Sequence, residues 1–161
     1  MRKNKTFTRA YYKNKFKQQF KDLCYIPQEN EEIRQCKAPY PKYWFLSNKG
    51  YLFSAFGANL KLIKPYYKET GIKDKNGNRT GYTWEYKVKG KKHNKHIIVH
   101  KLMCDTFLEN EFDNYDEPME IHHKRKKNKF NLNQSQFCNR ADNLQLLPQS
   151  LHKELTKYSS K

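Results

Sequence analysis

The stretch MEIHHKRKKN, residues 119–128, places two histidines side by side directly before a run of positive charge. The chain holds only six histidines among 161 residues, so an adjacent pair is scarce by chance. Histidine acts both as a neutral metal ligand and as a base near neutral pH. His122 and His123 are therefore either a ligand beside a general base or two solvated surface residues, and the surrounding sequence must discriminate between these interpretations.

The residues that follow the pair predict the order strand, loop, strand, helix. Short apolar runs favour strands, a long polar stretch favours a loop, and Pro148 suits the first position of a helix. The expected elements are a strand at 120–123, a loop over 124–141, a strand over 142–148 and a helix over 149–158.

A third histidine, His152, falls in the second turn of this expected helix, within reach of a strand end. Neighbouring side chains on a regular strand face opposite ways, so His122 and His123 share a site only if the strand ends or distorts there. The lysine-rich loop that starts at Lys124 favours such an end. Phosphodiester hydrolysis needs a base for the attacking water and positive charge on the developing oxyanion, and a divalent metal can supply that charge.

The charge balance points to a polyanionic partner. The chain carries 33 Lys and Arg against 16 Asp and Glu, a formal net charge of +17. Nucleic acid is the first expectation and an anionic membrane surface the second. No apolar run approaches the roughly 18 residues that a spanning helix needs. We also see no signal-peptide core and no close cysteine pair, so we expect reduced thiols in a cytoplasm rather than a zinc ribbon.

Residues 1–23 are basic and carry an aromatic stripe. Tyr12, Phe16, Phe20 and Leu23 recur at helical spacing. This pattern predicts a helix whose stripe docks on the body and whose basic residues stay free for phosphate; a solvated arm is the alternative. Residues 26–42 are acidic and then proline-punctuated, which is typical of a linker.

Residues 43–108 indicate a strand-rich region. Two apolar runs flank the turn Ser47–Gly50, and Asn76-Gly77 is a strong hairpin signal. We expect one further strand over 60–67, a strand over 82–88, and a strand that turns into a helix within 96–112, where His100 is a packing or helix-start residue. Residues 109–120 concentrate six acids, a loop expected to point away from a phosphate backbone.

At this point the sequence resembles two known modules. EIHHKRKKN together with NRADNLQLLPQSLH resembles the HNH nuclease motif, the ββα-metal fold, including its nine-residue interval between Asn143 and His152. YWFLSNKGYLFSAFG, GYTWEYKV and HIIVHKLMCDTFL are similar to the NUMOD4 module that precedes HNH domains in phage and intron-type homing endonucleases. The expected fold is α+β, with a basic N-terminal arm and linker over 1–42, a NUMOD4-like DNA-binding module over 43–108 and the HNH motif over 109–161.

The resemblance implies a role for each motif residue. His122 and His152 would be metal ligands, His123 the general base that activates water, and Asn143 a brace for the loop that orients His123. Colicin-type members have a further histidine four residues after His152, where this chain has Thr156. Two protein ligands argue for an ion such as Mg²⁺ that keeps several waters, with Mn²⁺ or Zn²⁺ as alternatives.

The resulting expectation is a metal-dependent endonuclease acting on double-stranded DNA in a bacterial or phage-infected cytoplasm. A catalytically inactive DNA-binding protein on an HNH scaffold and a basic RNA-binding protein are the alternatives, although no RRM or KH pattern is visible. The sequence leaves open whether the protein is a monomer or a homodimer. The residues expected to contact nucleic acid are Lys124, Arg125, Lys126, Lys127 and Lys129 in the loop and Arg9, Lys13 and Lys17 in the arm.

Overall fold

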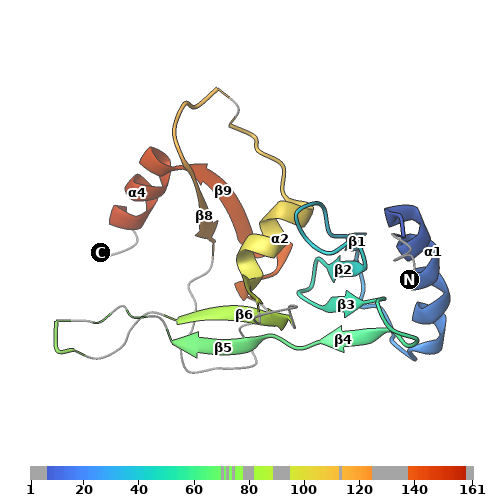
Figure 1. The fold of residues 1–161 in the computed structure, drawn as a ribbon. Coiled ribbons are helices and arrows are strands. Elements are labelled where there is room, and N and C mark those ends of the chain that lie inside the picture. Colours follow the sequence, from blue (N-terminus) through green and yellow to red (C-terminus); the bar gives the residue numbers. More distant parts are fainter. Residues whose placement is uncertain are drawn as a thin grey trace, which may run out of the picture.

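The structure, a computed structural model, describes residues 7–69, 71, 73, 75–77, 82–88, 95–112, 114–124 and 138–158. Its described part contains antiparallel sheets and helices, with helix α2 (Val99–Phe107) in contact with strands of all the sheets (Figure 1). A four-stranded sheet has the order β1-β2-β3-β4, a three-stranded sheet the order β5-β6-β7, and β8 and β9 form a hairpin. The mixed α and β content agrees with the expected class.

The first sheet is built around the turn that the sequence predicts. Strands β2 (Trp44–Ser47) and β3 (Leu52–Ser54) pair antiparallel on either side of it. Gly50 has a φ of 92°, a left-handed conformation that glycine adopts without steric cost. Both strands are almost fully buried, which explains their continuous apolar character.

Two parts of this region differ from the sequence-based expectation. The segment expected to be a linker supplies a strand, β1 (Ile33–Gln35), which pairs with β2. The single strand expected over 60–67 is instead two strands in different sheets, β4 (Lys61–Ile63) and β5 (Tyr66–Glu69). Pro65 lies between them, and its missing N–H together with its fixed φ interrupts the ladder.

The second sheet follows the expected pattern. Strand β6 (Tyr82–Val88) pairs antiparallel with β5 on one side and with β7 (Lys95–Ile98) on the other. Gly77, in the segment between β5 and β6, has a φ of 79°, as the Asn-Gly hairpin signal predicts. Strand β7 runs directly into α2, which matches the expected change from strand to helix.

One hydrophobic core joins the predicted modules. Trp44 and Leu46 of the first sheet, Tyr86 of the second, Leu102 of α2 and Leu144 of the C-terminal hairpin belong to the same buried cluster. Because these residues come from both the 43–108 and the 109–161 segments, the hairpin is anchored to the sheets through α2 rather than tethered by a loop alone.

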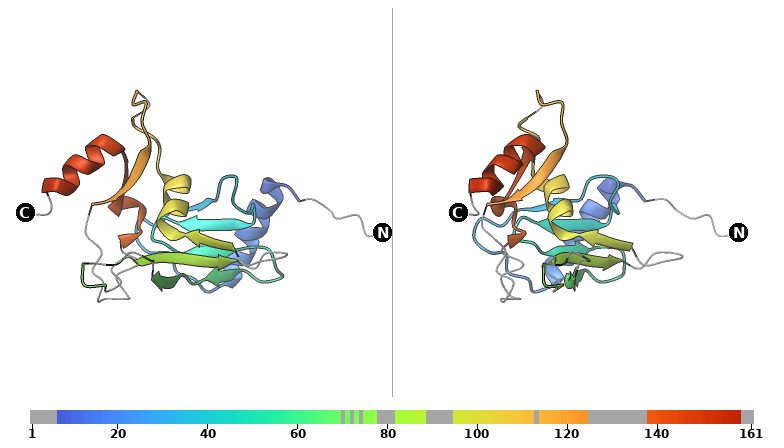
Figure 2. Two further views of the ribbon diagram at one scale, coloured as in Figure 1. Left: turned by 60° about the vertical axis from the view of Figure 1, so that its left-hand side comes forward. Right: turned by 90° about the vertical axis from the view of Figure 1, so that its left-hand side faces the viewer.

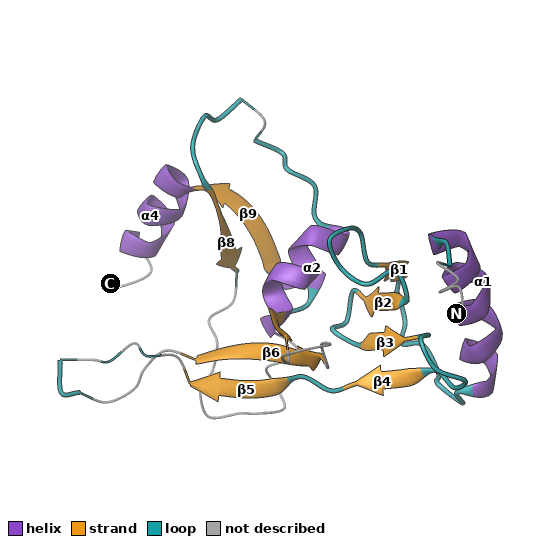
Figure 3. Cartoon of the chain, in the orientation of Figure 1, coloured by secondary structure: helices purple, strands orange, loops and turns teal. Residues whose placement is uncertain are grey.

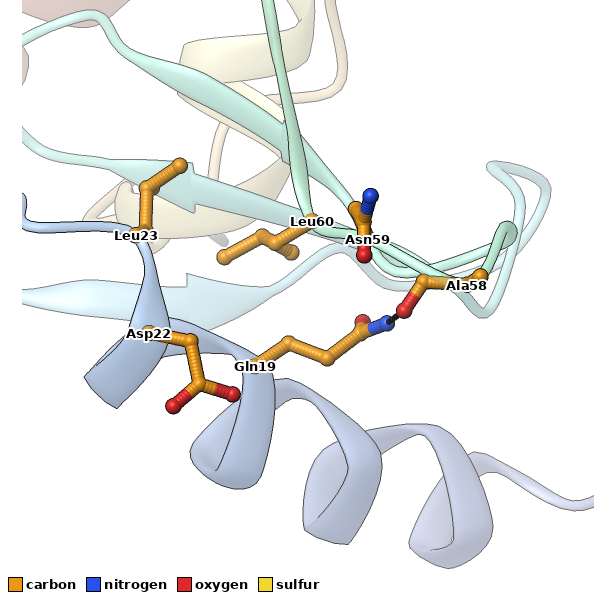
Figure 4. A pocket seen from close by; sticks show the side chains of 6 residues that line it. All are labelled: Gln19, Asp22, Leu23, Ala58, Asn59 and Leu60. Atoms are coloured by element: carbon orange, nitrogen blue, oxygen red, sulfur yellow. Dashed lines mark hydrogen bonds between the residues drawn. The ribbon is translucent and has the colours of Figure 1, made fainter.

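Helix α1 (Arg9–Asp22) docks on the first sheet, so the solvated-arm alternative is wrong for this segment. The ring of Phe16 stacks on Phe45 with 4.0 Å between centroids. On the same helix, Gln19 donates to the carbonyl oxygens of Gly57 and Ala58, beside a small hollow of about 120 Å³ between α1 and the β3–β4 connection (Figure 4). The aromatic stripe therefore packs inward, and the basic face of α1 remains outside.

The C-terminal elements form a ββα unit. Strand β8 (Met119–His123) pairs antiparallel with β9 (Leu144–Pro148), which follows a short 3₁₀ helix, η2 (Ala141–Asn143), and leads directly into helix α4 (Gln149–Tyr158). Pro148 ends β9 instead of starting α4. Figures 1 and 3 show α4 on one side of the hairpin and α2 on the other, and the turned views agree (Figure 2).

Candidate active site

Strand β8 directs the two adjacent histidines to opposite faces of the hairpin. The ladder is regular up to its last residues, with His122 opposite Gln145 and His123 opposite Leu144. The strand ends at His123, as expected, but it is not distorted before that point. The two imidazoles consequently have different neighbours, one toward α4 and the other toward α2.

On the α4 face, His122 meets His152. The two ring centroids are 5.3 Å apart, and the ring planes meet at 71°. Burial, together with the nearby His152, lowers the pKa of His122 below its ordinary value, because both disfavour a positive charge on the ring. His122 is thus kept neutral near pH 7, the form in which imidazole binds metal.

Glu120 shares this face, because it lies two residues before His122 on the same strand. Its Oε2 lies 2.5 Å from Nδ1 of His152, and its Oε1 accepts a 3.0 Å hydrogen bond from Nε2 of Gln149. These bonds, first that of Gln149 and then that of His152, lower the pKa of Glu120. Glu120 lies on β8, as the strand expected at 120–123 predicts, and its two-residue offset from His122 was the available signal for its place on this face.

The opposite face holds His123, Asn139 and His100. Nε2 of His123 lies 3.1 Å from Oδ1 of Asn139, whose side chain is almost fully buried. The ring of His100, from α2, stands perpendicular to that of His123 at 5.3 Å between centroids. From the sequence, His100 was expected to be a packing or helix-start residue. Asn139 was assigned no role, because the spacing of the HNH motif points to Asn143.

Asn143 is buried at the junction of η2 and β9. Its side-chain Nδ2 donates a 2.8 Å hydrogen bond to the backbone carbonyl oxygen of Cys138. Its backbone carbonyl oxygen accepts a hydrogen bond from the backbone N–H of Lys124. These two bonds connect the end of the loop between the strands to the residue that follows His123. The contacts are those that a loop brace makes.

The donor set around His122 fits a divalent ion held by two imidazoles. In the described part of the chain, no three His, Cys, Asp or Glu side chains are grouped as a ready metal site. The carboxylate of Glu120 contacts Nδ1 of His152. A carboxylate that accepts a hydrogen bond from one nitrogen of a histidine is the usual support for a histidine whose other nitrogen binds metal. Two imidazoles suit Mn²⁺ or Zn²⁺ more closely than Mg²⁺, which prefers oxygen.

The basic residues expected to contact nucleic acid fall into three groups. Lys13 and Lys17 are exposed on α1, whereas Arg9 donates to the carbonyl oxygen of Cys36 and so anchors the helix internally. Lys124 is exposed, and its Nζ donates to the carbonyl oxygen of Asp142 at 3.2 Å. The remaining loop residues, Arg125, Lys126, Lys127 and Lys129, lie outside the described residues.

Thr156 stands one turn after His152 on α4. Its hydroxyl donates to the carbonyl oxygens of His152 and Lys153. This hydroxyl is therefore turned back onto its own helix. No histidine lines the hollow in Figure 4. No histidine lines a second hollow, of about 520 Å³, beside Tyr40.

Comparisons by sequence give no match, whereas a comparison of structures matches the chain to a solved protein. No protein-family model matches the sequence, and no curated protein matches it. A structural comparison matches the chain to a solved structure described as "DNA binding and cleavage by the HNH homing endonuclease I-HmuI", at 19% identity and a TM-score of 0.48. The match covers 80% of this chain and 59% of that chain. No helix in the described part of this protein is long and apolar enough to cross a membrane.

Proposed function

We propose that this protein is a metal-dependent DNA endonuclease of the HNH type. The observation that carries the proposal is the ββα unit itself, in which residues 30 positions apart, His122 of β8 and His152 of α4, come to 5.3 Å between ring centroids. A fold that only binds DNA has no need to bring two imidazoles together. The sequence resemblance to HNH nucleases supports the same conclusion.

His123 is the proposed general base. With the Asn139 oxygen as acceptor, Nε2 of His123 keeps its proton and Nδ1 is the nitrogen able to take one from water. Asn139 on one side and the ring of His100 on another restrict the rotation of His123. Asn143 does not contact His123 in these bonds; it binds the backbone of Cys138 and of Lys124, on either side of the segment between β8 and β9.

His122 and His152 would hold the divalent ion. When bound, the ion supplies positive charge for the phosphate oxygens and for the leaving group. The chain's own contribution is to keep His122 neutral and His152 oriented. Mg²⁺ with several retained waters remains the proposed physiological ion, although Mn²⁺ and Zn²⁺ suit two imidazole ligands more closely.

Double-stranded DNA is the proposed partner, because a net charge of +17 needs a polyanion and basic side chains occur on more than one described element. Lys13 and Lys17 project from α1. On the second sheet, Lys68, Lys87 and His96 share the outer face, since they alternate with the strand residues that face the core. An antiparallel sheet of this kind can enter a major groove.

Supercoiled plasmid provides the direct test. We expect cleavage with Mg²⁺ or Mn²⁺ and none with EDTA. His123→Ala should lose about 10²- to 10⁴-fold in cleavage rate, the usual contribution of a general base, while its DNA affinity stays close to that of the unsubstituted protein. Thr156→Ala is the matched control on α4 and should cleave normally. Full activity of His123→Ala would remove this residue from catalysis.

A DNA-binding protein without catalysis is the second candidate. The regular ladder through His123 favours it, because His122 and His123 then contact different partners on opposite faces of β8. Tight, salt-sensitive DNA binding with no cleavage in any divalent ion would establish this alternative over the nuclease.

A further inference from the structure

Glu120 connects the first turn of α4 to the histidine pair. Its two carboxylate oxygens have separate partners: Oε1 accepts from Nε2 of Gln149 at 3.0 Å, and Oε2 lies 2.5 Å from Nδ1 of His152. Gln149 is itself fixed, because its backbone N–H donates to the carbonyl oxygen of Pro118. The carboxylate therefore cannot rotate without losing both bonds.

This arrangement distinguishes the two nitrogens of His152. Nδ1 is directed at a carboxylate, which only accepts hydrogen bonds when ionised. Oε1 of Glu120 already accepts from Nε2 of Gln149, and Oε2 faces Nδ1 of His152 at 2.5 Å, so both carboxylate oxygens act as acceptors. Nδ1 must then carry the proton, and Nε2, on the far edge of the ring, is left with its lone pair available.

We propose that Glu120 is a positioning residue that holds His152 in the Nδ1–H tautomer and so makes Nε2 the metal-binding nitrogen. The metal part of this statement rests on the proposed function; the tautomer part does not. Glu120 is not itself a ligand in this assignment, because both of its oxygens are engaged by protein donors. A carboxylate in this place also makes the imidazole a stronger ligand.

Glu117 is a matched control that the chain itself provides. This second carboxylate also reaches the start of α4, where its oxygens accept hydrogen bonds from the backbone N–H and the hydroxyl of Ser150 at 2.9 and 2.6 Å. It touches no histidine in these contacts. Glu117→Ala therefore loosens the same end of the helix while leaving the partner of His152 in place.

The first experiment reads the tautomer of His152 by ¹⁵N NMR in the full-length, metal-free protein at mildly alkaline pH. The unsubstituted protein and Glu117→Ala should show Nδ1 protonated and Nε2 bare. Glu120→Ala should shift His152 toward the Nε2–H form, which free histidine favours. An Nε2–H form in the unsubstituted protein, or an unchanged tautomer in Glu120→Ala, overturns the proposal.

The second experiment measures Zn²⁺ affinity by calorimetry. Glu120→Ala should bind Zn²⁺ about 10- to 100-fold more weakly, the usual effect of removing such a support, and Glu117→Ala should bind nearly normally. Glu120→Gln keeps a carbonyl oxygen near Nδ1, so it should retain the tautomer and part of the affinity. If Glu120→Ala does not fold, Glu120→Leu takes its place: it keeps side-chain bulk without an acceptor, so it should show the same tautomer shift and loss of affinity, and an unchanged tautomer overturns the proposal.

Equal losses of affinity in Glu117→Ala and Glu120→Ala would show a general loosening of α4 and overturn the specific role. Failure of the unsubstituted protein to cleave DNA would count against the proposed nuclease only, because the tautomer is read without metal or DNA.

Discussion

Asn139 is the residue that most changes the interpretation of the histidine pair. It is buried in the last turn of the polar loop, and its Oδ1 lies 3.1 Å from Nε2 of His123. The spacing of the HNH motif points to Asn143 as the residue that orients His123, but the side chain of Asn143 donates to the carbonyl oxygen of Cys138 instead. The two asparagines therefore have different contacts: Asn143 binds the backbone at Cys138, and Asn139 binds the imidazole of His123.

Asn139→Ala should lower the single-turnover cleavage rate about tenfold, the equivalent of one positioning hydrogen bond of about 1.4 kcal/mol. Its Zn²⁺ affinity should not change, because Asn139 contacts the opposite face of β8 from His122 and His152. Comparing rate and metal affinity in the same preparation separates these effects. A loss of metal affinity equal to the loss of rate would show that the substitution disturbs the whole hairpin.

At the scale of elements, α1 is attached by an aromatic interface that is separate from the main core. Phe16 is the centre of this interface, stacked on Phe45 and in edge contact with Phe53. Phe16→Ala should reduce the free energy of unfolding in urea by about 3 kcal/mol, at the lower end of the range for a buried phenylalanine. Phe7→Ala, at an exposed ring, should cost about 1 kcal/mol or less. Similar small costs for both would mean that α1 detaches readily.

The three-stranded sheet contains a buried carboxylate, Glu85 of the central strand β6, which residues of both flanking strands contact. Tyr66 donates to it at 2.7 Å, Lys68 lies at 3.4 Å and Nδ1 of His96 at 3.1 Å. Burial alone would raise the pKa of Glu85, but the hydrogen bond from Tyr66 and the charge of Lys68 outweigh it and lower the pKa. An ionised Glu85 is therefore part of the folded sheet.

A carboxylate with a lowered folded-state pKa stabilises the protein above its unfolded value, and this contribution disappears as the pH falls through the lowered value. We expect the free energy of unfolding to decrease below about pH 4.5. Glu85→Gln should cost about 1–3 kcal/mol at pH 7 and should flatten the acid part of the curve. Glu69→Gln, at an exposed position on β5, should change stability by less than about 0.5 kcal/mol. Urea titrations across pH would contradict this view if the curve of the Glu85→Gln variant kept the slope of the unsubstituted protein.

At the scale of the whole molecule, DNA binding is expected to be distributed over several basic surfaces. Lys13 and Lys17 lie four residues apart on α1, so they occupy one face, away from the buried Tyr12 and Phe16. Lys15 lies on the same helix, but its Nζ donates to the carbonyl oxygen of Phe56 at 3.2 Å. The helix therefore offers both test positions and a control.

Lys13→Ala and Lys17→Ala should each reduce the slope of log affinity against log salt concentration by about 1, because each removes one phosphate contact and its released counterion. Lys15→Ala should leave the slope closer to that of the unsubstituted protein. Fluorescence titrations with duplex DNA over a series of salt concentrations would measure these slopes. Unchanged slopes for Lys13→Ala and Lys17→Ala would restrict α1 to a structural role.

Much of the architecture follows from local pattern. The Ser47–Gly50 turn, the strand over Tyr82–Val88, and the two strands and helix that follow residue 118 appear close to where the sequence predicts them. These features depend on backbone preferences and on side-chain period, which neighbouring residues express without help from the rest of the fold. The pairing of His122 with His152 is of another kind, because it joins residues 30 positions apart and depends on how α4 packs on the hairpin.

Other features exist only in the folded molecule. The segment 26–42 has no strand pattern, yet β1 forms there. It forms because it pairs with the edge of β2 and because Cys36, which follows it, is buried in the core. Asn139 and Glu120 obtain their roles from partners 16 and 32 residues away, and no spacing rule connects them. By itself, the sequence determined the order of strands and helix after residue 119 and the candidate histidines that they carry. The tertiary structure decided which face of β8 each histidine occupies and which carboxylate or amide fixes it, because hydrogen bonds between distant segments depend on how the elements pack.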